Sequence, residues 1–156
     1  MRERFLTLLF ALARLRQVER SGERSALVDF HACHKYLLLA YEETGMRELG
    51  RIVAAVAERP WPETLALYRE RFARAFARPA RVVAHIDALQ HAFGHVSEGL
   101  SSPERAHFLD QLGELRASRL PLVGTSPCCA AGCSASTWTT CTDRPTLEPY
   151  PRDLVG

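Results

Sequence analysis

Lysine is nearly absent from this sequence, which has a single lysine, Lys35, against nineteen arginines. Arginine presents a flat, permanently charged fork that suits phosphate and carboxylate groups, but a GC-rich genome produces the same bias and is the simpler explanation. The formal net charge is only +2, which is low for a protein that binds nucleic acid through charge alone. The arginine content by itself therefore identifies no ligand.

Long apolar runs are also absent, and none approaches the roughly 20 residues that a membrane-spanning helix needs. Residues 1–10 combine arginines with an apolar stretch, but no small-residue cleavage site follows, so we expect an amphipathic helix of a cytoplasmic protein and not an export signal. There is no glycine-rich phosphate loop, serine nucleophile elbow or HExxH motif. We therefore expect no catalytic residues and no cofactor.

Apolar residues recur at helical spacing in six segments, which are separated by proline, glycine or serine. The helices expected are residues 4–20, 26–43, 46–59, 62–77, 80–99 and from about 102 up to Pro121. Ser25 is expected to cap the second helix, Thr44–Gly45 to end it, and Ser101–Glu104 to form a capped start of the sixth. The fold class predicted is all-α, a compact bundle of about six helices.

The composition changes after residue 124, because four of the five cysteines lie in residues 128–141. We therefore divide the chain into a helical domain, residues 1–124, and an irregular Cys-rich tail, residues 125–156. A thiolate metal site is disfavoured because these cysteines do not have paired CxxC spacing. Disulfides are disfavoured because the chain has no export signal. Residues 126–141 can also be back-translated with GC-rich codons and shifted by one nucleotide to give helical apolar spacing. The hypothesis is that a frameshift at about residues 126–145 replaced a seventh helix, and resequencing the gene would test it. A further alternative is that the frameshift leaves a poorly folded protein without activity.

The second expected helix carries a dense polar stretch, residues 30–35. His31, His34 and Lys35 are three or four residues apart, so they are neighbours on a helix surface and form one polar cluster. Cys33 and His34 could be written as nucleophile and base, but adjacent helical residues point about 100° apart. We therefore expect Cys33 to pack as a small buried hydrophobe.

The fifth expected helix supplies an alternative site. Asp87, His91 and His95 follow one another at four-residue steps, so they lie on one helix face and could supply metal ligands. Histidines at this spacing also serve as polar groups that bond across helices. A metal-dependent enzyme or metal-binding domain that uses the histidines of the second and fifth helices is therefore the alternative function.

Taken together, these motifs resemble the YbgA-like family, a bacterial domain of unknown function found alone or behind a thiouracil desulfidase domain. The residues that carry the resemblance are 27–31 with His34 and Lys35, 47–54, His85 with 89–91 and Gly94, 119–122, and 147–151. The chain departs from the family pattern at Asp87, where asparagine is usual, and at His95–Val96, where an aromatic pair is usual.

The resemblance implies a role rather than a reaction. The iron–sulfur cluster of the fused desulfidase belongs to the partner domain, so the helical domain would present RNA, in particular transfer RNA, to a desulfidase in cis or in trans. The candidate RNA-contacting residues are His31, His34, Lys35, His85, Gln90 and His91. Cations neutralise phosphates, and the rings of histidine, Tyr36 and Tyr41 can stack on unpaired bases. We expect the second and fifth helices to pack side by side and bring these residues together in a non-catalytic accessory domain.

Overall fold

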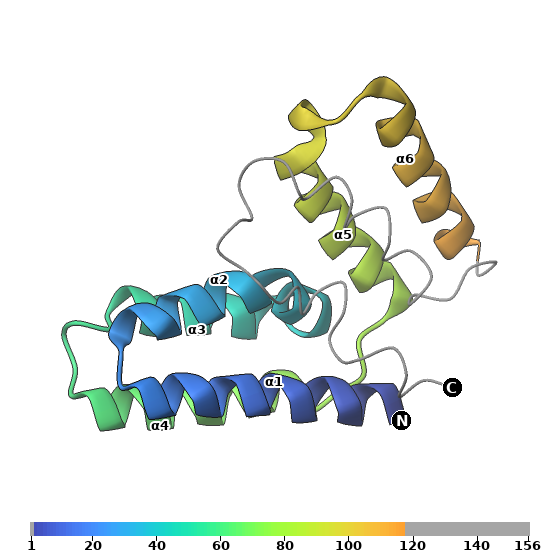
Figure 1. The fold of residues 1–156 in the computed structure, drawn as a ribbon. Coiled ribbons are helices and arrows are strands. Elements are labelled where there is room, and N and C mark those ends of the chain that lie inside the picture. The colour runs from blue at the N-terminus through green and yellow to red at the C-terminus, as the bar shows by residue number, and fades with distance from the viewer. Residues whose placement is uncertain (1, 118–156) are drawn as a thin grey trace.

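The computed structural model describes residues 2–117 of the chain. They form α1 (Arg2–Ser21), α2 (Arg24–Tyr41), α3 (Glu43–Ala54), α4 (Trp61–Ala75), α5 (Val82–Val96), a short 3₁₀ helix η1 (Ser97–Gly99) and α6 (Ser102–Arg116), as Figure 1 shows. Residues 2–117 contain no strand, so the all-α class and the six helices are confirmed. The Cys-rich tail and its frameshift hypothesis lie outside the described residues.

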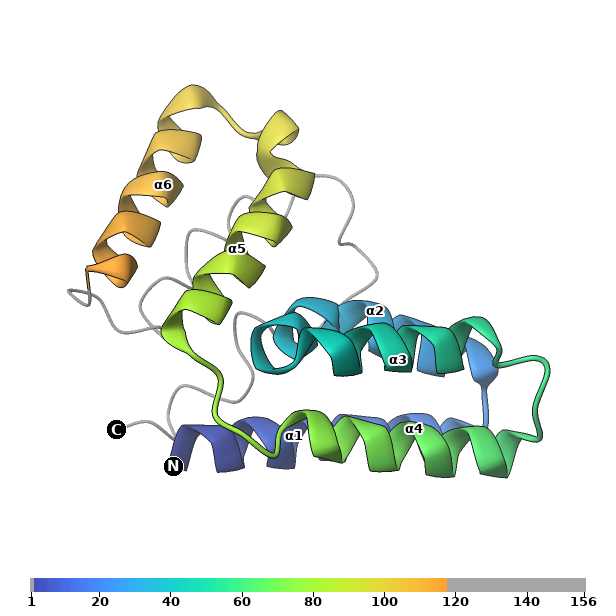
Figure 2. The ribbon, with the colours of Figure 1, turned by 180° about the vertical axis from the view of Figure 1, so that it is seen from behind.

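Helices α1 to α4 form a bundle of two layers, with α1 beside α4 and α2 beside α3 (Figures 1 and 2). Each helix turns an apolar face into the same interior, which fits the helical spacing of its apolar residues. The largest fully buried apolar side chains of this core are Leu15, Leu27, Leu38, Leu49, Tyr68, Phe72 and Phe76. This core holds the first four helices together.

Helices α5 and α6 form a hairpin at one end of the bundle, with a second, smaller core of their own. Phe93 and Phe108 stack with ring centroids 4.2 Å apart, next to buried leucines from both helices. Helix α5 also packs along α2, as predicted. Ala40 on α2 and Ala88 on α5 are both buried.

The helix ends depart from two of the predicted caps. Helix α2 begins at Arg24 after an extended Glu23 that makes no side-chain capping bond, so the prediction that Ser25 caps it is wrong. Gly45 lies within the first turn of α3 and does not end the preceding helix, because the break falls at the extended Glu42. A Cβ on Gly45 would lie 2.7 Å from Nη2 of Arg71, which would then have to move, so this glycine serves close packing and not a turn.

Other helix ends agree with the sequence. Helix α4 begins with Pro62 in its first turn, and α6 begins at the expected serine, where the Ser101 backbone N–H donates to the Glu104 carboxylate at 2.8 Å. Helix α3 ends earlier than predicted, at Ala54, and residues 55–58 form turns. In the described part of the chain, every helix is too short or too polar to cross a lipid bilayer.

Candidate functional site

The polar stretch of α2 does not form a single surface cluster. Lys35 is exposed and its Nζ lies 5.8 Å from the centroid of the Tyr36 ring, whereas His31 is half-buried and His34 is only 2% exposed. Cys33 is half-buried and so less enclosed than predicted. Of the three predicted contact residues on this helix, Lys35 is therefore the one most available to an external ligand.

His31 faces α3 and α4. Its Nδ1 is joined to the Tyr68 hydroxyl by a hydrogen bond of 3.1 Å, and a Cβ on Gly50 would lie 3.4 Å from its Nε2. Burial, followed by the charge of Lys35, lowers the pKa of His31 to about 4, and burial raises the pKa of the Tyr68 hydroxyl. Both groups are therefore neutral at neutral pH, and the pair joins α2 to α4.

His34 lies inside the main core. Its Nδ1 donates a hydrogen bond of 2.8 Å to the backbone carbonyl of Phe30, so the ring carries its proton on Nδ1. The ring stacks on Phe30 at 3.9 Å and meets Phe72 edge-on at 5.9 Å. Burial lowers its pKa to about 3, and Nε2 is buried without a hydrogen-bond partner among residues 2–117. The imidazole is thus a neutral packing element in this structure.

His85 supports the end of α2. It is half-buried, and burial lowers its pKa to about 4, so it is neutral at neutral pH. Its ring lies edge-on to Tyr41 at 5.8 Å, and the ring of Phe76 lies 4.6 Å from Tyr41 on another side. These two contacts fix the position of the Tyr41 ring.

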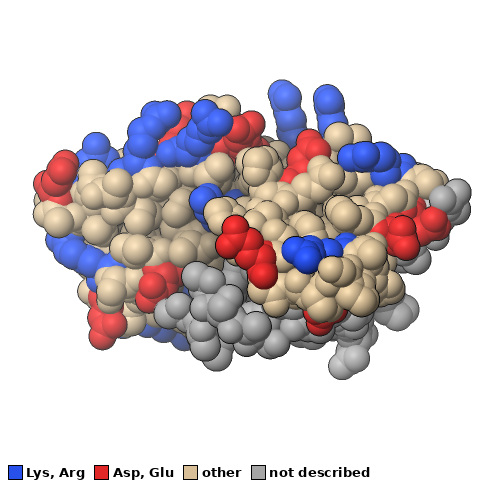
Figure 3. Space-filling model, turned by 90° about the horizontal axis from the view of Figure 1, so that it is seen from above, with Lys and Arg blue, Asp and Glu red and all other residues tan. Residues whose placement is uncertain are grey.

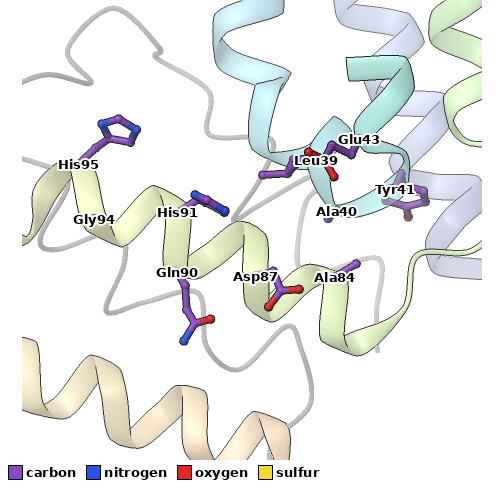
Figure 4. Close-up of a pocket in the computed structure, with 10 residues that line it drawn as sticks. All are labelled: Leu39, Ala40, Tyr41, Glu43, Ala84, Asp87, Gln90, His91, Gly94 and His95. Atoms are coloured by element: carbon purple, nitrogen blue, oxygen red, sulfur yellow. The ribbon is translucent and has the colours of Figure 1, made fainter. Parts of the chain in front are cut away.

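A hollow of about 840 Å³ separates α5 from the junction of α2 and α3 (Figure 4). We call it the α5 groove, and it is lined by Leu39, Ala40, Tyr41, Glu43, Ala84, Asp87, Gln90, His91, Gly94 and His95. Helix α5 is inclined to α2 (Figure 1), and His85 lies next to Tyr41 and His95 next to Tyr36, with ring centroids 5.8 and 6.2 Å apart. Gln90 and His91, two of the predicted contact residues, therefore line the groove.

The polar groups of the groove come from both walls. Asp87, Gln90 and His91 are exposed on α5, and Figure 4 shows His91 projecting toward the α2–α3 junction while Gln90 turns toward α6. From the opposite wall Glu43 faces the groove and accepts a hydrogen bond of 2.6 Å from Arg47. Sequence reasoning missed Glu43, because nothing near it in the sequence shows that α5 crosses the end of α2.

The predicted groups therefore do not share one place. His31 and His34 face the interior of the four-helix bundle, and Gln90 and His91 line the α5 groove. Helices α2 and α5 do pack together, but they do so through the later part of α2. The structure does not gather all six candidates into one site.

Arg71 braces the wall that carries Glu43. Its guanidinium, 13% exposed, donates to Glu42 at 2.9 Å and to Glu48, so one side chain of α4 ties together both sides of the start of α3. The hydrogen bond from Arg71 lowers the pKa of Glu42, and the carboxylates raise the pKa of Arg71, with Glu42 the larger cause. Arg71 is thus a structural arginine and not part of a free basic surface.

The remaining arginines of α4 and its end, Arg69, Arg74 and Arg78, are exposed. Arg69 lies 3.6 Å from Glu19, and Arg74 lies 4.0 Å from Glu70. Figure 3 shows Lys and Arg side chains along one edge of the molecule, with Asp and Glu side chains between them. The charged surface is therefore mixed in sign, as the small net charge implies.

Metal binding gains no support from the structure. Within residues 2–117, no three His, Cys, Asp or Glu side chains are grouped so that they could hold a metal ion. The set Asp87, His91 and His95 lines the groove, but as separate groups along α5. The metal alternative remains a prediction from spacing alone.

Comparison with known proteins places the chain in a family. The sequence model of the family described as "Protein of unknown function (DUF1722)" matches residues 35–151, which include Lys35 and the whole lining of the α5 groove. The chain is similar to the uncharacterized protein YbgA of Escherichia coli (strain K12), with 29% identity over 119 residues that cover 74% of this chain and 69% of that protein. No solved structure matches. The chain therefore belongs to the DUF1722 family, whose function is unknown, and the resemblance to YbgA-like domains is confirmed.

Proposed function

We propose that this helical domain is a non-catalytic module that contacts RNA, with transfer RNA as the ligand, and that it serves thiouracil desulfidase chemistry performed by a partner domain. The observation that carries the RNA proposal is the α5 groove, whose lining includes exposed Gln90 and His91 and the ring of Tyr41. Proteins that recognise unpaired RNA combine such hydrogen-bonding and aromatic groups with nearby cations. The desulfidase link rests on the family resemblance.

The candidate residues take different roles in this proposal. Exposed Lys35 and the exposed arginines Arg74 and Arg78 would neutralise phosphates, while the groove would contact bases. The positive charges of Arg74 and Arg78 contribute to the lowered pKa of Glu42, the residue before Glu43 of the groove wall. This supports a role for the two arginines in binding the RNA backbone near the groove. The enclosed, neutral imidazoles His31, His34 and His85 would support the helices rather than contact phosphate.

Transfer-RNA binding measured against salt concentration tests the proposal. The affinity is expected to fall linearly on logarithmic axes as salt is added, because each neutralised phosphate releases counterions. Lys35→Ala is expected to weaken binding and reduce the magnitude of the slope by about one. His34→Ala is a poor probe, since a side chain that is 2% exposed tests folding first.

The matched control is Arg16→Ala, which removes one positive charge from an exposed position on α1. It is expected to leave the salt slope close to that of the wild type, since α1 carries none of the proposed phosphate contacts and no residue of the groove lining. Absence of salt-sensitive binding at low ionic strength would remove the RNA proposal. An equal effect of both substitutions would show that only overall charge matters.

A further inference from the structure

Both walls of the α5 groove carry a carboxylate. Glu43 projects from α3 and is paired with Arg47 at 2.6 Å, whereas Asp87 projects from α5, is exposed, and has no ion-pair partner among the described residues. A phosphate that entered the groove would meet the uncompensated charge of Asp87, and like charges repel. The groove is therefore unsuited to the RNA backbone.

Carboxylates instead accept hydrogen bonds from N–H donors. Among RNA bases, cytosine, adenine and guanine present an exocyclic amino group on their pairing edge, whereas uracil presents a single imino N–H between two carbonyl oxygens there. The volume of about 840 Å³ lies within the range of about 300–1,000 Å³ found for ligand clefts, so an unpaired base fits. The aromatic ring of Tyr41, fixed by Phe76 and His85, forms part of one wall.

We infer that the α5 groove binds an unpaired, amino-bearing base of RNA, which is cytosine, adenine or guanine, with Asp87 accepting a hydrogen bond from the exocyclic amino group. The inference rests on the proposed RNA-contacting function and adds an orientation to it. The base enters the groove, and the phosphates stay outside it, where the exposed cations Lys35, Arg74 and Arg78 are available. Uracil is disfavoured because it has no amino group, and the carbonyl oxygens on both sides of its imino N–H would lie close to the Asp87 carboxylate.

The first experiment needs no variant. Affinities of the full chain are measured at low salt for short single-stranded homopolymers of cytidylate, adenylate and uridylate, all of equal length. Cytidylate and adenylate are expected to bind at least about fivefold more tightly than uridylate, the lower limit for a good hydrogen-bonded base contact. Equal affinities for the three homopolymers would overturn the inference.

The second experiment uses the sign of one substitution. Asp87→Asn removes the groove charge, and Asp110→Asn removes the same charge from an exposed position on α6 outside the groove lining. Asp87→Asn is expected to reduce the preference for cytidylate over uridylate to less than about twofold, and Asp110→Asn to leave it unchanged. If the groove held phosphate, Asp87→Asn would tighten binding of all three homopolymers more than Asp110→Asn does, which would also overturn the inference.

The outcomes separate the inference from the function on which it rests. Salt-sensitive binding of transfer RNA without a base preference would leave the proposed function standing and remove the groove assignment. No binding of transfer RNA or of any homopolymer at low salt would remove both. Thermal melts of the two variants confirm that any loss of binding occurs in a folded protein.

Discussion

Acid should destabilise this protein through the buried imidazole of His34. Burial lowers its pKa from 6.5 to about 3. Below about pH 6.5 this imidazole therefore binds a proton in the unfolded chain but not in the folded chain. Because the unfolded state then binds more protons, stability is complete above that pH and falls by about 1.4 kcal/mol per pH unit as the pH decreases toward the folded pKa. Between about pH 7 and about pH 5, His34 alone should therefore remove about 2 kcal/mol from the free energy of unfolding.

Urea denaturation at the two pH values, followed by circular dichroism, measures this loss in the wild type and in His34→Asn. Asparagine does not titrate and keeps an N–H donor for the Phe30 carbonyl, to which His34 donates at 2.8 Å. His31 and His85 also have pKa values lowered to about 4 by burial, but they are present in both proteins. The difference between the two losses therefore isolates His34.

The control for removing a histidine as such is His107→Asn, at an exposed position on α6. It should retain the acid sensitivity of the wild type. If the wild type and His34→Asn lost the same free energy between the two pH values, His34 would not be buried as a neutral group, and the packing described for α2 would be refuted.

Three further predictions concern the fold, and denaturant midpoints measure each. Phe72→Ala should lower the free energy of unfolding by about 3–5 kcal/mol, since Phe72 is 0% exposed and its removal opens a cavity in the main core. Arg71→Lys should lower it by about 1–2 kcal/mol, because an ammonium cannot bridge Glu42 and Glu48 as the planar guanidinium does. Gly22→Ala should lower it by about 1–2 kcal/mol, since Gly22 has φ 68°, where a Cβ is strained.

Each of these substitutions has a matched control. Leu67→Ala removes an apolar side chain that is 40% exposed and should have a much smaller effect than the core substitution. Arg69→Lys changes an arginine whose side chain is 52% exposed and should be nearly neutral. Gly113→Ala adds a methyl group to α6 with nothing within 4 Å and should be neutral or stabilising. Any pair with equal effects would contradict the corresponding argument.

Local signals in the sequence predicted the helices well and their junctions less well. Apolar periodicity and the prolines located all six helices, because these signals act within a few residues. The junction of α2 and α3 was misplaced because Gly45 was read as a local stop signal. Its actual role is to make room for Arg71, which lies 26 residues later in the chain and could not be placed beside it from periodicity.

The candidate site was predicted only in part, because it too depends on contacts between helices that are far apart in the sequence. Spacing on an isolated helix puts His31, His34 and Lys35 together, but α2 packs against α4 on one side and α5 on another, so burial differs for each side chain. Gln90 and His91 do line a groove. Their neighbour Glu43 depends on where α5 crosses α2, which is a property of the assembled fold and of no single segment.

The division of the interior into two cores sets an order of assembly during synthesis. Every buried member of the larger core lies between Ala11 and Phe76, so that core can close while α5 and α6 are still inside the ribosome. The smaller core needs residues from Ile86 to Leu115, and the groove needs α5 docked on α2. The nascent chain thus acquires a stable body first and the α5 groove later, so a fragment that ends before α5 should fold once it is released from the ribosome, without forming the groove.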